Sequence, residues 1–308
     1  MKNILITGGA GYIGSALAEQ LLQNEEAEKV VIFDNLSRNN YHFFLGSAFP
    51  NKHKISFVDG ELLDSRKLKK ALAGIDTVVH LAAKVTTPFA DADPHYFEQV
   101  NHWGTAELVY AVEESQVKQF IYASSVSVYG SSSEMIHEGH PPNPRTIYGI
   151  SKMRGEEHVA RLMDKMNTQI LRLGNVYGYS HAVRFDAVIN RFMFDANFNN
   201  RIAINGDGKQ YRPFIAIHKL KGLLEQIIFN GSIPSGHYNI VDQNFQVLDI
   251  VDVLKELYPE MEFTFINQHL KLRELVVSPD SKLKQYIDFG AVGELKEDLV
   301  RFKKHLRF

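Results

Sequence analysis

The chain contains no cysteine among its 308 residues. This absence excludes disulfides, thiolate nucleophiles and zinc sites built on cysteine, and it fits a reducing compartment. Histidines are present, but none lies four residues from another, so the His-x-x-x-His metal motif does not occur. We therefore expect a cytoplasmic protein without a structural metal.

A net excess of charge is also lacking, since 34 Lys and Arg residues stand against 36 Asp and Glu residues, giving a net charge of -2. Such a balance provides no long-range attraction to nucleic acid or to a membrane surface. Apolar runs of the roughly 20 residues that cross a bilayer are missing too. The composition, which is 44% hydrophobic, instead allows one large core or two unequal ones.

Short apolar runs rich in β-branched residues alternate with longer helix-like stretches in the first half of the chain. Continuous apolarity of this kind indicates strands buried on both faces of a parallel sheet. We therefore predict an α/β fold with a Rossmann-type doubly wound parallel sheet. The runs cover residues 2–7, 29–34, 54–60, 76–83, 119–125 and 168–178.

After about residue 175 this regular alternation ends. Turn sequences such as NGDGKQ and NGSIPSGH separate helices from short strands. We expect residues 176–308 to form mainly a smaller mixed lobe, interleaved with the sheet domain of residues 1–175. The stretch 131–146 is polar and rich in proline, and we interpret it as a functional or mobile loop.

Residues 6–18, ITGGAGYIGSALA, admit two interpretations. The A-x-A sequence at 16–18 resembles the cleavage site of a secretory signal. The same stretch holds Gly8, Gly11 and Gly14 between a predicted strand and a predicted helix. A glycine-rich turn in that position binds pyrophosphate through backbone amides and the positive end of the helix dipole.

Asp34 decides between the two interpretations. It ends the second predicted strand, where a carboxylate accepts hydrogen bonds from an adenosine ribose. A signal peptide gives no reason for such a strand, so we favour a dinucleotide site. The carboxylate repels the 2′-phosphate of NADP and favours NAD, although the nearby Arg38 weakens that preference. The alternative is that Asp34 is only a turn residue.

A second group of side chains follows the fifth predicted strand. Tyr148 and Lys152 are four residues apart in a helical segment, so they share one face. An ammonium beside a phenol lowers the pKa of the phenol and makes tyrosine usable as a base. Roughly one such pair arises by chance, but Ser124, Ser125 and Ser127 precede this pair at a strand end, where ligands of open α/β sheets bind. A serine hydroxyl there can share its proton with Tyr148.

The motifs TGGAGYIG, DNLS, VVHLAA, NHWGT, SSVSVYG, YGISK and LRLGNVYG follow one another over nearly the whole chain. With these motifs the chain resembles the extended short-chain dehydrogenase/reductase family, in particular the NAD-dependent nucleotide-sugar epimerases and dehydratases of the UDP-glucose/UDP-galactose 4-epimerase type. The resemblance implies an NAD-binding Rossmann domain in residues 1–175 and a substrate-binding lobe mainly in 176–308. It also implies tightly held NAD and a nucleoside-diphosphate sugar as substrate.

The resemblance implies roles for individual residues as well. The catalytic set is Ser125, Tyr148 and Lys152, and Asn101 is expected to bond backbone near the catalytic helix. Cofactor binding falls to Gly8, Gly11, Tyr12, Ile13, Gly14, Asp34, Asn35, Glu61, Leu62, Leu81, Ala82, Ala83, Asn101, Tyr148 and Lys152. Substrate binding falls to Ser125, Ser127, Asn175, Arg212 and Arg273, with the two arginines on the diphosphate.

Some positions depart from the family pattern. Glu61 stands where an aspartate usually contacts adenine, and Lys84 stands where glutamine is common. Pro213 and His218 replace two common aspartates. These changes leave the identity of the sugar and of the nucleotide open.

Three reactions use this arrangement. A dehydratase needs an acid and a base directly after the catalytic serine, but Val126 and Ser127 stand there and neither transfers protons at neutral pH. A 4-epimerase needs only Ser125, Tyr148, Lys152 and NAD, and it works through a transient 4-keto-sugar and bound NADH. We therefore favour the epimerase. The alternatives are an NAD(P)-dependent 4-keto-sugar reductase or dehydrogenase, and a binding protein without catalysis.

Two long helical segments, 93–115 and 148–166, carry more apolar residues than a sheet-covering face requires. The resemblance implies that they pair with their copies as the four-helix bundle of a homodimer. The alternative is that these residues are all core, as helical apolar stripes usually are. The residues concerned are Tyr96, Val100, Trp103, Met153, Val159 and Met163.

Overall fold

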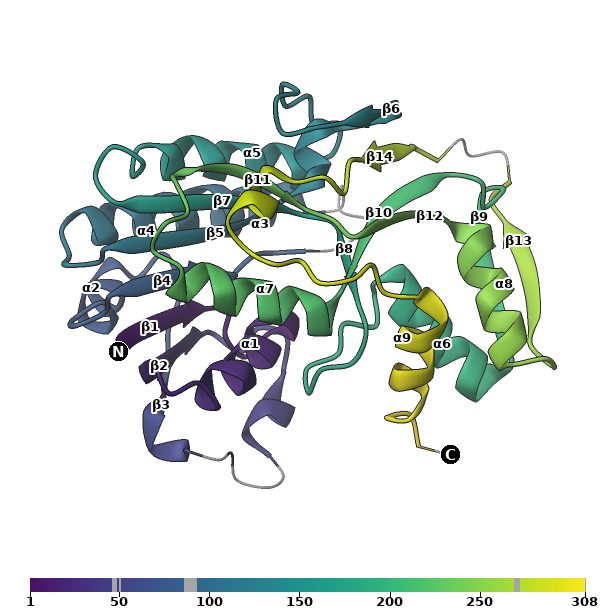
Figure 1. The fold of residues 1–308 in the computed structure, drawn as a ribbon, viewed down its shortest axis with the longest axis horizontal. Coiled ribbons are helices and arrows are strands. Elements are labelled where there is room, and N and C mark those ends of the chain that lie inside the picture. The colour runs from purple at the N-terminus through teal and green to yellow at the C-terminus, as the bar shows by residue number, and fades with distance from the viewer. Residues whose placement is uncertain (46–48, 50, 86–92, 269–271, 308) are drawn as a thin grey trace.

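The structure is a computed structural model that describes residues 1–45, 49, 51–85, 93–268 and 272–307. A seven-stranded parallel sheet in the order β11-β7-β5-β4-β1-β2-β3 forms its centre (Figure 1). The predicted Rossmann-type doubly wound sheet is therefore confirmed. Its strands are β1 (Lys2–Thr7), β2 (Ala27–Asp34), β3 (Ile55–Asp59), β4 (Thr77–His80), β5 (Gln119–Ser125), β7 (Asn167–Leu173) and β11 (Gly236–Ile240).

The sheet is buried on both faces because successive side chains of a strand point to opposite sides. In β1, Ile4 and Ile6 join one core cluster, whereas Leu5 between them joins another. Helices from different parts of the chain close each face (Figure 1). They are α1 (Tyr12–Leu22) and α7 (Ile217–Phe229) on the first face, and α2 (Ser65–Ala71), α4 (Gly104–Glu113) and α5 (Ile147–Ala160) on the second.

A smaller lobe lies beside the sheet, at the right in Figure 1. Its core contains the buried residues Ile189, Phe214, Leu254 and Phe302. The chain returns from this lobe to the large sheet through α7 and β11, so the two parts are interleaved in sequence. The elements of the lobe are β8 (Asn175–Tyr177), α6 (Val188–Asn199), β9 (Arg201–Asn205), β10 (Tyr211–Ala216), β12 (Gln243–Gln246), α8 (Val247–Leu257), β13 (Glu262–Ile266) and α9 (Leu295–Lys303).

A π-helix interrupts the long helix expected at 93–115. The short α3 (Pro94–Phe97) leads into η4 (Glu98–Trp103), which is π-helical, and α4 follows directly. Turns of this kind inside helices are frequent at functional sites, and this one carries Asn101. The described residues also form the short helices η1 (Tyr41–Phe44), η2 (Lys52–Lys54), η5 (Val126–Tyr129) and η6 (Lys282–Gln285).

Two further expectations differ from the structure. The run at 168–178 is not one strand, because the chain leaves the large sheet at Gly174 and β8 joins the β12-β10-β8 sheet. The stretch 131–146 contains a strand, β6 (Ser132–Ile136), which pairs in parallel with β14 (Leu275–Val277). Because the partner strand lies far along the chain, no local pattern could reveal this pairing.

The apolar residues expected on a dimer face differ in exposure. Val159 is fully buried in the core beneath α5, which corrects its assignment to that face. Val100 and Met163 are partly buried against the same core, and Met153 packs against a neighbouring cluster. Trp103, by contrast, is 55% exposed. A helix that covers a sheet turns its stripe inward, so burial of Val159 follows from the position of α5.

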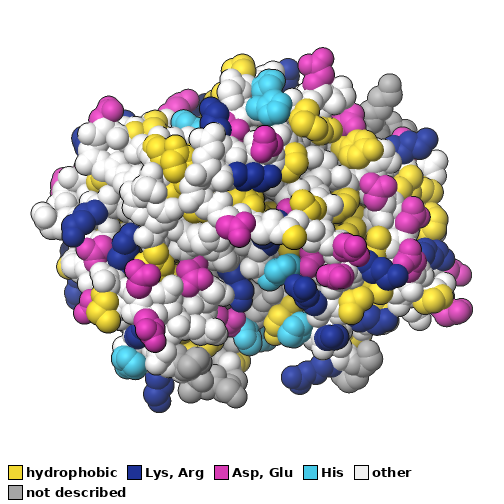
Figure 2. All heavy atoms as spheres, viewed as in Figure 1, with side chains coloured by type: hydrophobic (Ala, Val, Ile, Leu, Met, Phe, Trp, Pro, Cys, Tyr) yellow, Lys and Arg dark blue, Asp and Glu magenta, His cyan; other side chains and the backbone are white. Residues whose placement is uncertain are grey.

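The molecular surface carries no extended field of one sign on the face shown in Figure 2. Acidic and basic side chains are interspersed there, as the net charge of -2 suggests. Within the described ranges, the helices are too short or too polar to span a bilayer.

Candidate active site

A cleft of about 970 Å³ opens between the carboxyl ends of the central strands and the lobe. The turn after β1 and the ends of β2, β4 and β5 line one side, and residues of β8, β9, β10 and α6 line the other. Ligands of open α/β sheets bind at this edge. The volume lies at the upper end of small-molecule sites, which measure about 300–1,000 Å³.

The turn between β1 and α1 fits a pyrophosphate because it leaves no room for side chains. Gly8 has a φ of +69° and a Cβ there would lie 2.6 Å from the Ala82 amide nitrogen. A Cβ on Gly14 would lie 2.3 Å from the Gly8 carbonyl oxygen. Gly11 is the N-cap of α1, and no described side chain caps that end of the helix. The first-turn amides therefore remain available to an anion.

Asp34, at the end of β2, lies beside this turn. Its carboxylate accepts hydrogen bonds from the Ala10 amide at 3.1 Å and from the Leu36 amide at 2.8 Å. Burial raises the pKa of Asp34, and these backbone bonds oppose the change. Asn35, the residue after Asp34, donates to Glu61 Oε1 at 2.9 Å. The carboxylates of Asp34 and Glu61 therefore line the same end of the cleft.

Asn101 is the one predicted cofactor residue that does not line the cleft. It is fully buried, and its side-chain amide donates to the Lys84 carbonyl oxygen and to Ser151 Oγ, each at 3.0 Å. Its Oδ1 accepts from the Lys84 amide at 2.8 Å. Asn101 thus bonds backbone near the catalytic helix, as expected, and holds the loop after β4 against α5. Its contact with the cofactor stays a prediction. The residues that line the cleft are Gly8, Gly11, Tyr12, Ile13, Gly14, Asp34, Asn35, Glu61, Leu62, Leu81, Ala82, Ala83, Tyr148 and Lys152.

The predicted catalytic side chains also meet in this cleft. Ser125 ends β5, and its hydroxyl donates to Ser127 Oγ at 3.1 Å, while Tyr148 lines the same part of the cleft. Thr146 caps α5 by accepting from the Gly149 amide at 3.0 Å, so the helix begins just before Tyr148. The spacing of one helical turn then places Lys152 on the same face as Tyr148.

Burial dominates the protonation of this set. It raises the pKa of Tyr148, against the charge of Arg184 and the hydrogen bond with Ser125. It lowers the pKa of Lys152 to about 7, against the charge of Glu156. Burial therefore outweighs the two influences that lower the pKa of Tyr148, so the net direction is opposite to the one expected beside Lys152.

The predicted substrate residues line the cleft as well. Asn175 begins β8, and Arg212 lies on β10. Arg212 and Arg273 each give one N–H to a backbone carbonyl, and neither forms an ion pair within the described part of the chain. Their other N–H groups suit the oxygens of a diphosphate. Ser125 and Ser127 complete the set.

Arg38 and Arg184 share one carboxylate at the mouth of the cleft. Arg38 bonds the Val85 carbonyl oxygen, and its Nη1 lies 3.6 Å from Asp186 Oδ1. Arg184 Nε lies 3.0 Å from the same oxygen. Asp186 therefore holds the charge of Arg38, so Arg38 weakens the NAD preference of Asp34 less than the sequence suggested. No sequence motif marks Arg184 or Asp186.

Glu156 and Arg172 form a buried ion pair beneath the cleft that the sequence analysis missed. Arg172 stands inside an otherwise apolar strand, and Glu156 follows Lys152 by one helical turn. A charge inside a buried strand requires a partner. That requirement is the signal that could have predicted the pair.

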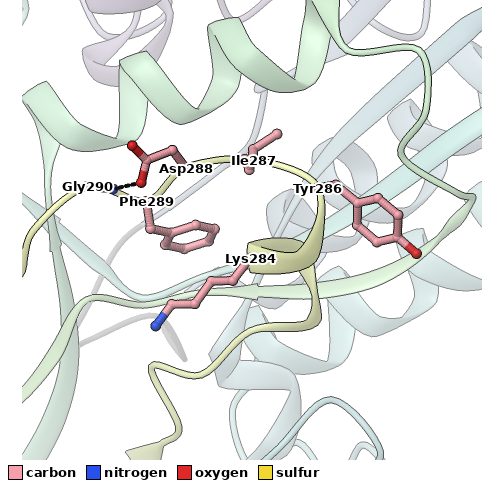
Figure 3. Close-up of a pocket in the computed structure, with 6 residues that line it drawn as sticks. All are labelled: Lys284, Tyr286, Ile287, Asp288, Phe289 and Gly290. Atoms are coloured by element: carbon pink, nitrogen blue, oxygen red, sulfur yellow. Dashed lines mark hydrogen bonds between the residues drawn. The ribbon is translucent and has the colours of Figure 1, made fainter.

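A second hollow, of about 480 Å³, lies over residues 284–290 (Figure 3). Asp288 accepts a hydrogen bond from the Gly290 amide at 2.7 Å, and the Lys284 ammonium lies 5.7 Å from the centre of the Phe289 ring. The Asp288 carboxylate is therefore already engaged by the backbone, and the Lys284 ammonium lies beside an aromatic ring.

Known proteins resemble this chain in both sequence and structure. The NAD dependent epimerase/dehydratase family matches residues 4–240. The dTDP-D-glucose 4,6-dehydratase of Mus musculus is 32% identical over 263 residues, which cover 83% of this chain and 72% of that protein. A putative UDP-glucose 4-epimerase of Methanocaldococcus jannaschii is 31% identical over 221 residues, covering 70% and 69%. The crystal structure of UDP-glucuronic acid 4-epimerase from Bacillus cereus, in complex with UDP-glucuronic acid and NAD, has 26% identity and a TM-score of 0.85, covering 98% of each chain.

Proposed function

This chain belongs to the NAD-dependent epimerase/dehydratase family of extended short-chain dehydrogenases/reductases, and from that membership we propose that it interconverts the C4 epimers of a nucleoside-diphosphate sugar. The observation that carries the proposal is the content of the site. Ser125, Tyr148 and Lys152 line the cleft. The residue that follows Ser125 in the chain, Val126, is apolar and 3% exposed. A dehydratase would need a proton-transferring pair at positions 126 and 127.

NAD is the cofactor of the family and of this chain. The residues present fit it, because the glycine turn excludes side chains where a pyrophosphate would lie and Asp34 lines the adjoining end of the cleft. Bound there, NAD would supply the hydride acceptor and donor that inversion at C4 of the sugar requires.

The side chains of the chain handle the proton of the same step. As the C4–H bond breaks, Tyr148 accepts the proton of the C4 hydroxyl and the sugar becomes a 4-keto-sugar. Ser125 donates a hydrogen bond to the reacting oxygen, and the Lys152 ammonium stabilises the phenolate form of Tyr148. Tyr148 returns the proton when the C4 hydroxyl forms again. Protons and hydride are therefore balanced over the cycle.

The lobe side of the cleft holds the rest of the substrate in this proposal. Arg212 and Arg273 bind the diphosphate, and Asn175 contacts a phosphate oxygen. A sugar that is anchored only through its diphosphate can rotate in the site once it is a ketone. The hydride then returns to the opposite face of the sugar ring. We further propose that the protein works as a homodimer.

The proposed function is tested by incubating the purified protein with UDP-, GDP-, CDP- and dTDP-sugars and analysing the products. The expected result is a C4 epimer at constant mass, formed without added NAD, together with NAD that stays bound through dialysis. A product lighter by one water would indicate a dehydratase. A reaction that consumes added NADH or NADPH would indicate a reductase, and either result would overturn the epimerase proposal.

A further inference from the structure

Glu156 is a carboxylate buried directly behind the catalytic face of α5. It is 5% exposed. Its two oxygens accept from Arg172 of β7, with Nε at 3.0 Å from Oε1 and Nη2 at 2.7 Å from Oε2. Ser124, the residue before Ser125 on β5, donates to Oε1 at 2.5 Å. The carboxylate therefore joins α5, β5 and β7.

These contacts tie together the elements that carry the catalytic set. Helix α5 provides Tyr148 and Lys152, and β5 ends in Ser125. The Glu156 carboxylate fixes the distance between them, because both elements bond to the same group. Glu156 itself does not line the cleft, so it acts only through its neighbours.

Glu156 also lies one helical turn from Lys152, which is 1% exposed. The ammonium of Lys152 lies 4.2 Å from the centre of the Tyr122 ring, a surface that cannot replace all the lost hydration. Burial lowers the pKa of Lys152 to about 7, and the charge of Glu156 is the influence that raises it. The titratable and charged groups that face this pair are His80, Tyr122, Arg172 and His237, and Tyr148 lies next to Tyr122.

We propose that Glu156 is a positioning residue of the active site, a buried counter-charge that keeps Lys152 in its ammonium form and holds Ser125 in register with Tyr148. The proposal rests on the proposed function for its effect on turnover. Its effect on Lys152 is independent of which reaction the chain catalyses.

The test compares Glu156→Gln with the wild type, each purified with its bound cofactor. Competitive reductive methylation with formaldehyde, followed by mass spectrometry of the peptide that contains Lys152, gives the pH at which this amine becomes reactive. We expect that midpoint to fall by about one pH unit in Glu156→Gln, because an opposite charge at close range is lost. We also expect kcat at pH 8 to fall at least about tenfold with little change in KM, and the alkaline limb of kcat to move to lower pH with the labelling midpoint.

Glu157→Gln is the matched control, since Glu157 is the exposed neighbour on the same helix, and its midpoint should equal that of the wild type. An unchanged midpoint in Glu156→Gln would overturn the counter-charge role, whether or not the chain proves to be an epimerase. If Glu156→Gln does not fold, Glu156→Asp retains the charge and shortens the side chain. In that variant the midpoint should stay near the wild-type value while kcat falls, and wild-type kcat would overturn the positioning role.

Discussion

Tyr148 lies at the centre of the proposed chemistry, and its ring and its hydroxyl have separable roles. The ring packs edge to face against Phe97, with centroids 6.3 Å apart, and phenylalanine would preserve this contact. The hydroxyl would carry the proton of the C4 hydroxyl in the proposed reaction. Removing only the oxygen therefore isolates the chemical role from the packing role.

We expect Tyr148→Phe to retain its fold and its bound NAD but to lose at least about a hundredfold in kcat, because general base catalysis contributes roughly 10²–10⁴-fold. Product analysis under saturating substrate measures the loss, and circular dichroism with NAD absorbance checks the fold and cofactor content. Turnover close to the wild-type value would remove Tyr148 as the base.

Asp34 governs the choice of cofactor at the same scale. We expect NAD to bind at least about tenfold more tightly than NADP, since the 2′-phosphate would face a carboxylate. Calorimetry on cofactor-free protein measures both dissociation constants. Arg38→Ala is the control and should keep the preference, because Asp186 already holds the charge of Arg38. Equal affinities in the wild type would refute the assignment.

At the scale of elements, the turn between β1 and α1 depends on close backbone contact. A Cβ on Gly14 would lie 2.3 Å from the Gly8 carbonyl oxygen, whereas a Cβ on Gly222 of α7 has no neighbour within 4 Å. Both glycines lie in helices. Comparing substitutions at Gly14 and Gly222 therefore separates the packing requirement of the turn from the general effect of glycine on helix stability.

We expect Gly14→Ala to lower the thermal unfolding midpoint and to lose bound NAD, because the turn must open to admit the methyl group. Gly222→Ala should keep NAD and be stabilised by up to about 1 kcal/mol, since alanine favours a helix over glycine. Thermal denaturation and the NAD content after dialysis provide the two measurements. Wild-type NAD content in Gly14→Ala would show that the turn tolerates a side chain.

Most of the large sheet could be predicted from the sequence because six of its seven strands are marked by a short-range signal. The exception is β11, which lies in the part of the chain that was expected to form mainly the smaller lobe. Runs of β-branched residues identify the strands, and the glycine turn with Asp34 fixes which edge binds a ligand. The spacing of Tyr148 and Lys152 identifies their common face. The glycines, Asp34, the serines, Tyr148 and Lys152 follow from these local patterns, whereas the other predicted lining residues came from the family resemblance.

The rest of the site depends on contacts between distant residues. Strand β6 exists only because β14 pairs with it. Asp186 meets Arg38 across the cleft, and Glu156 meets Arg172 on a neighbouring strand. Burial, which a sequence does not report, reverses the direction expected for the pKa of Tyr148.

At the scale of the whole molecule, the lobe is attached to the cofactor turn by the first residue of α1. The Tyr12 hydroxyl donates to the Gly178 carbonyl oxygen at 2.7 Å, and Ser180 Oγ donates to the Tyr12 carbonyl oxygen at 3.1 Å. The segment just after β8 is thereby fixed to the turn that would hold the pyrophosphate. Two hydrogen bonds of one residue therefore connect the predicted cofactor turn to the start of the lobe.

The proposed homodimer concerns the face built by η4, α4 and α5, which lie together on one side of the sheet. Trp103 is 55% exposed there and stacks on His102 with centroids 4.4 Å apart. Tyr110 lies about two helical turns after Trp103 and is 43% exposed. The Arg161 guanidinium carbon lies 5.1 Å from the centre of the Tyr110 ring. Large exposed aromatic side chains are enriched at interfaces between subunits.

We expect light scattering to give twice the chain mass of 35.0 kDa at micromolar concentration. Trp103→Glu should shift the protein toward the monomer, because a charge would be buried without a partner in the centre of the contact. Phe263→Glu is the matched control: Phe263 is also an exposed aromatic residue, 38% accessible, but it lies on β13 of the lobe and its replacement should leave the mass unchanged. Because α5 also carries Tyr148 and Lys152, dissociation by Trp103→Glu should lower kcat along with the mass. A wild-type mass of 35.0 kDa throughout the micromolar range would contradict the dimer and leave the aromatic residues of this face as ordinary surface.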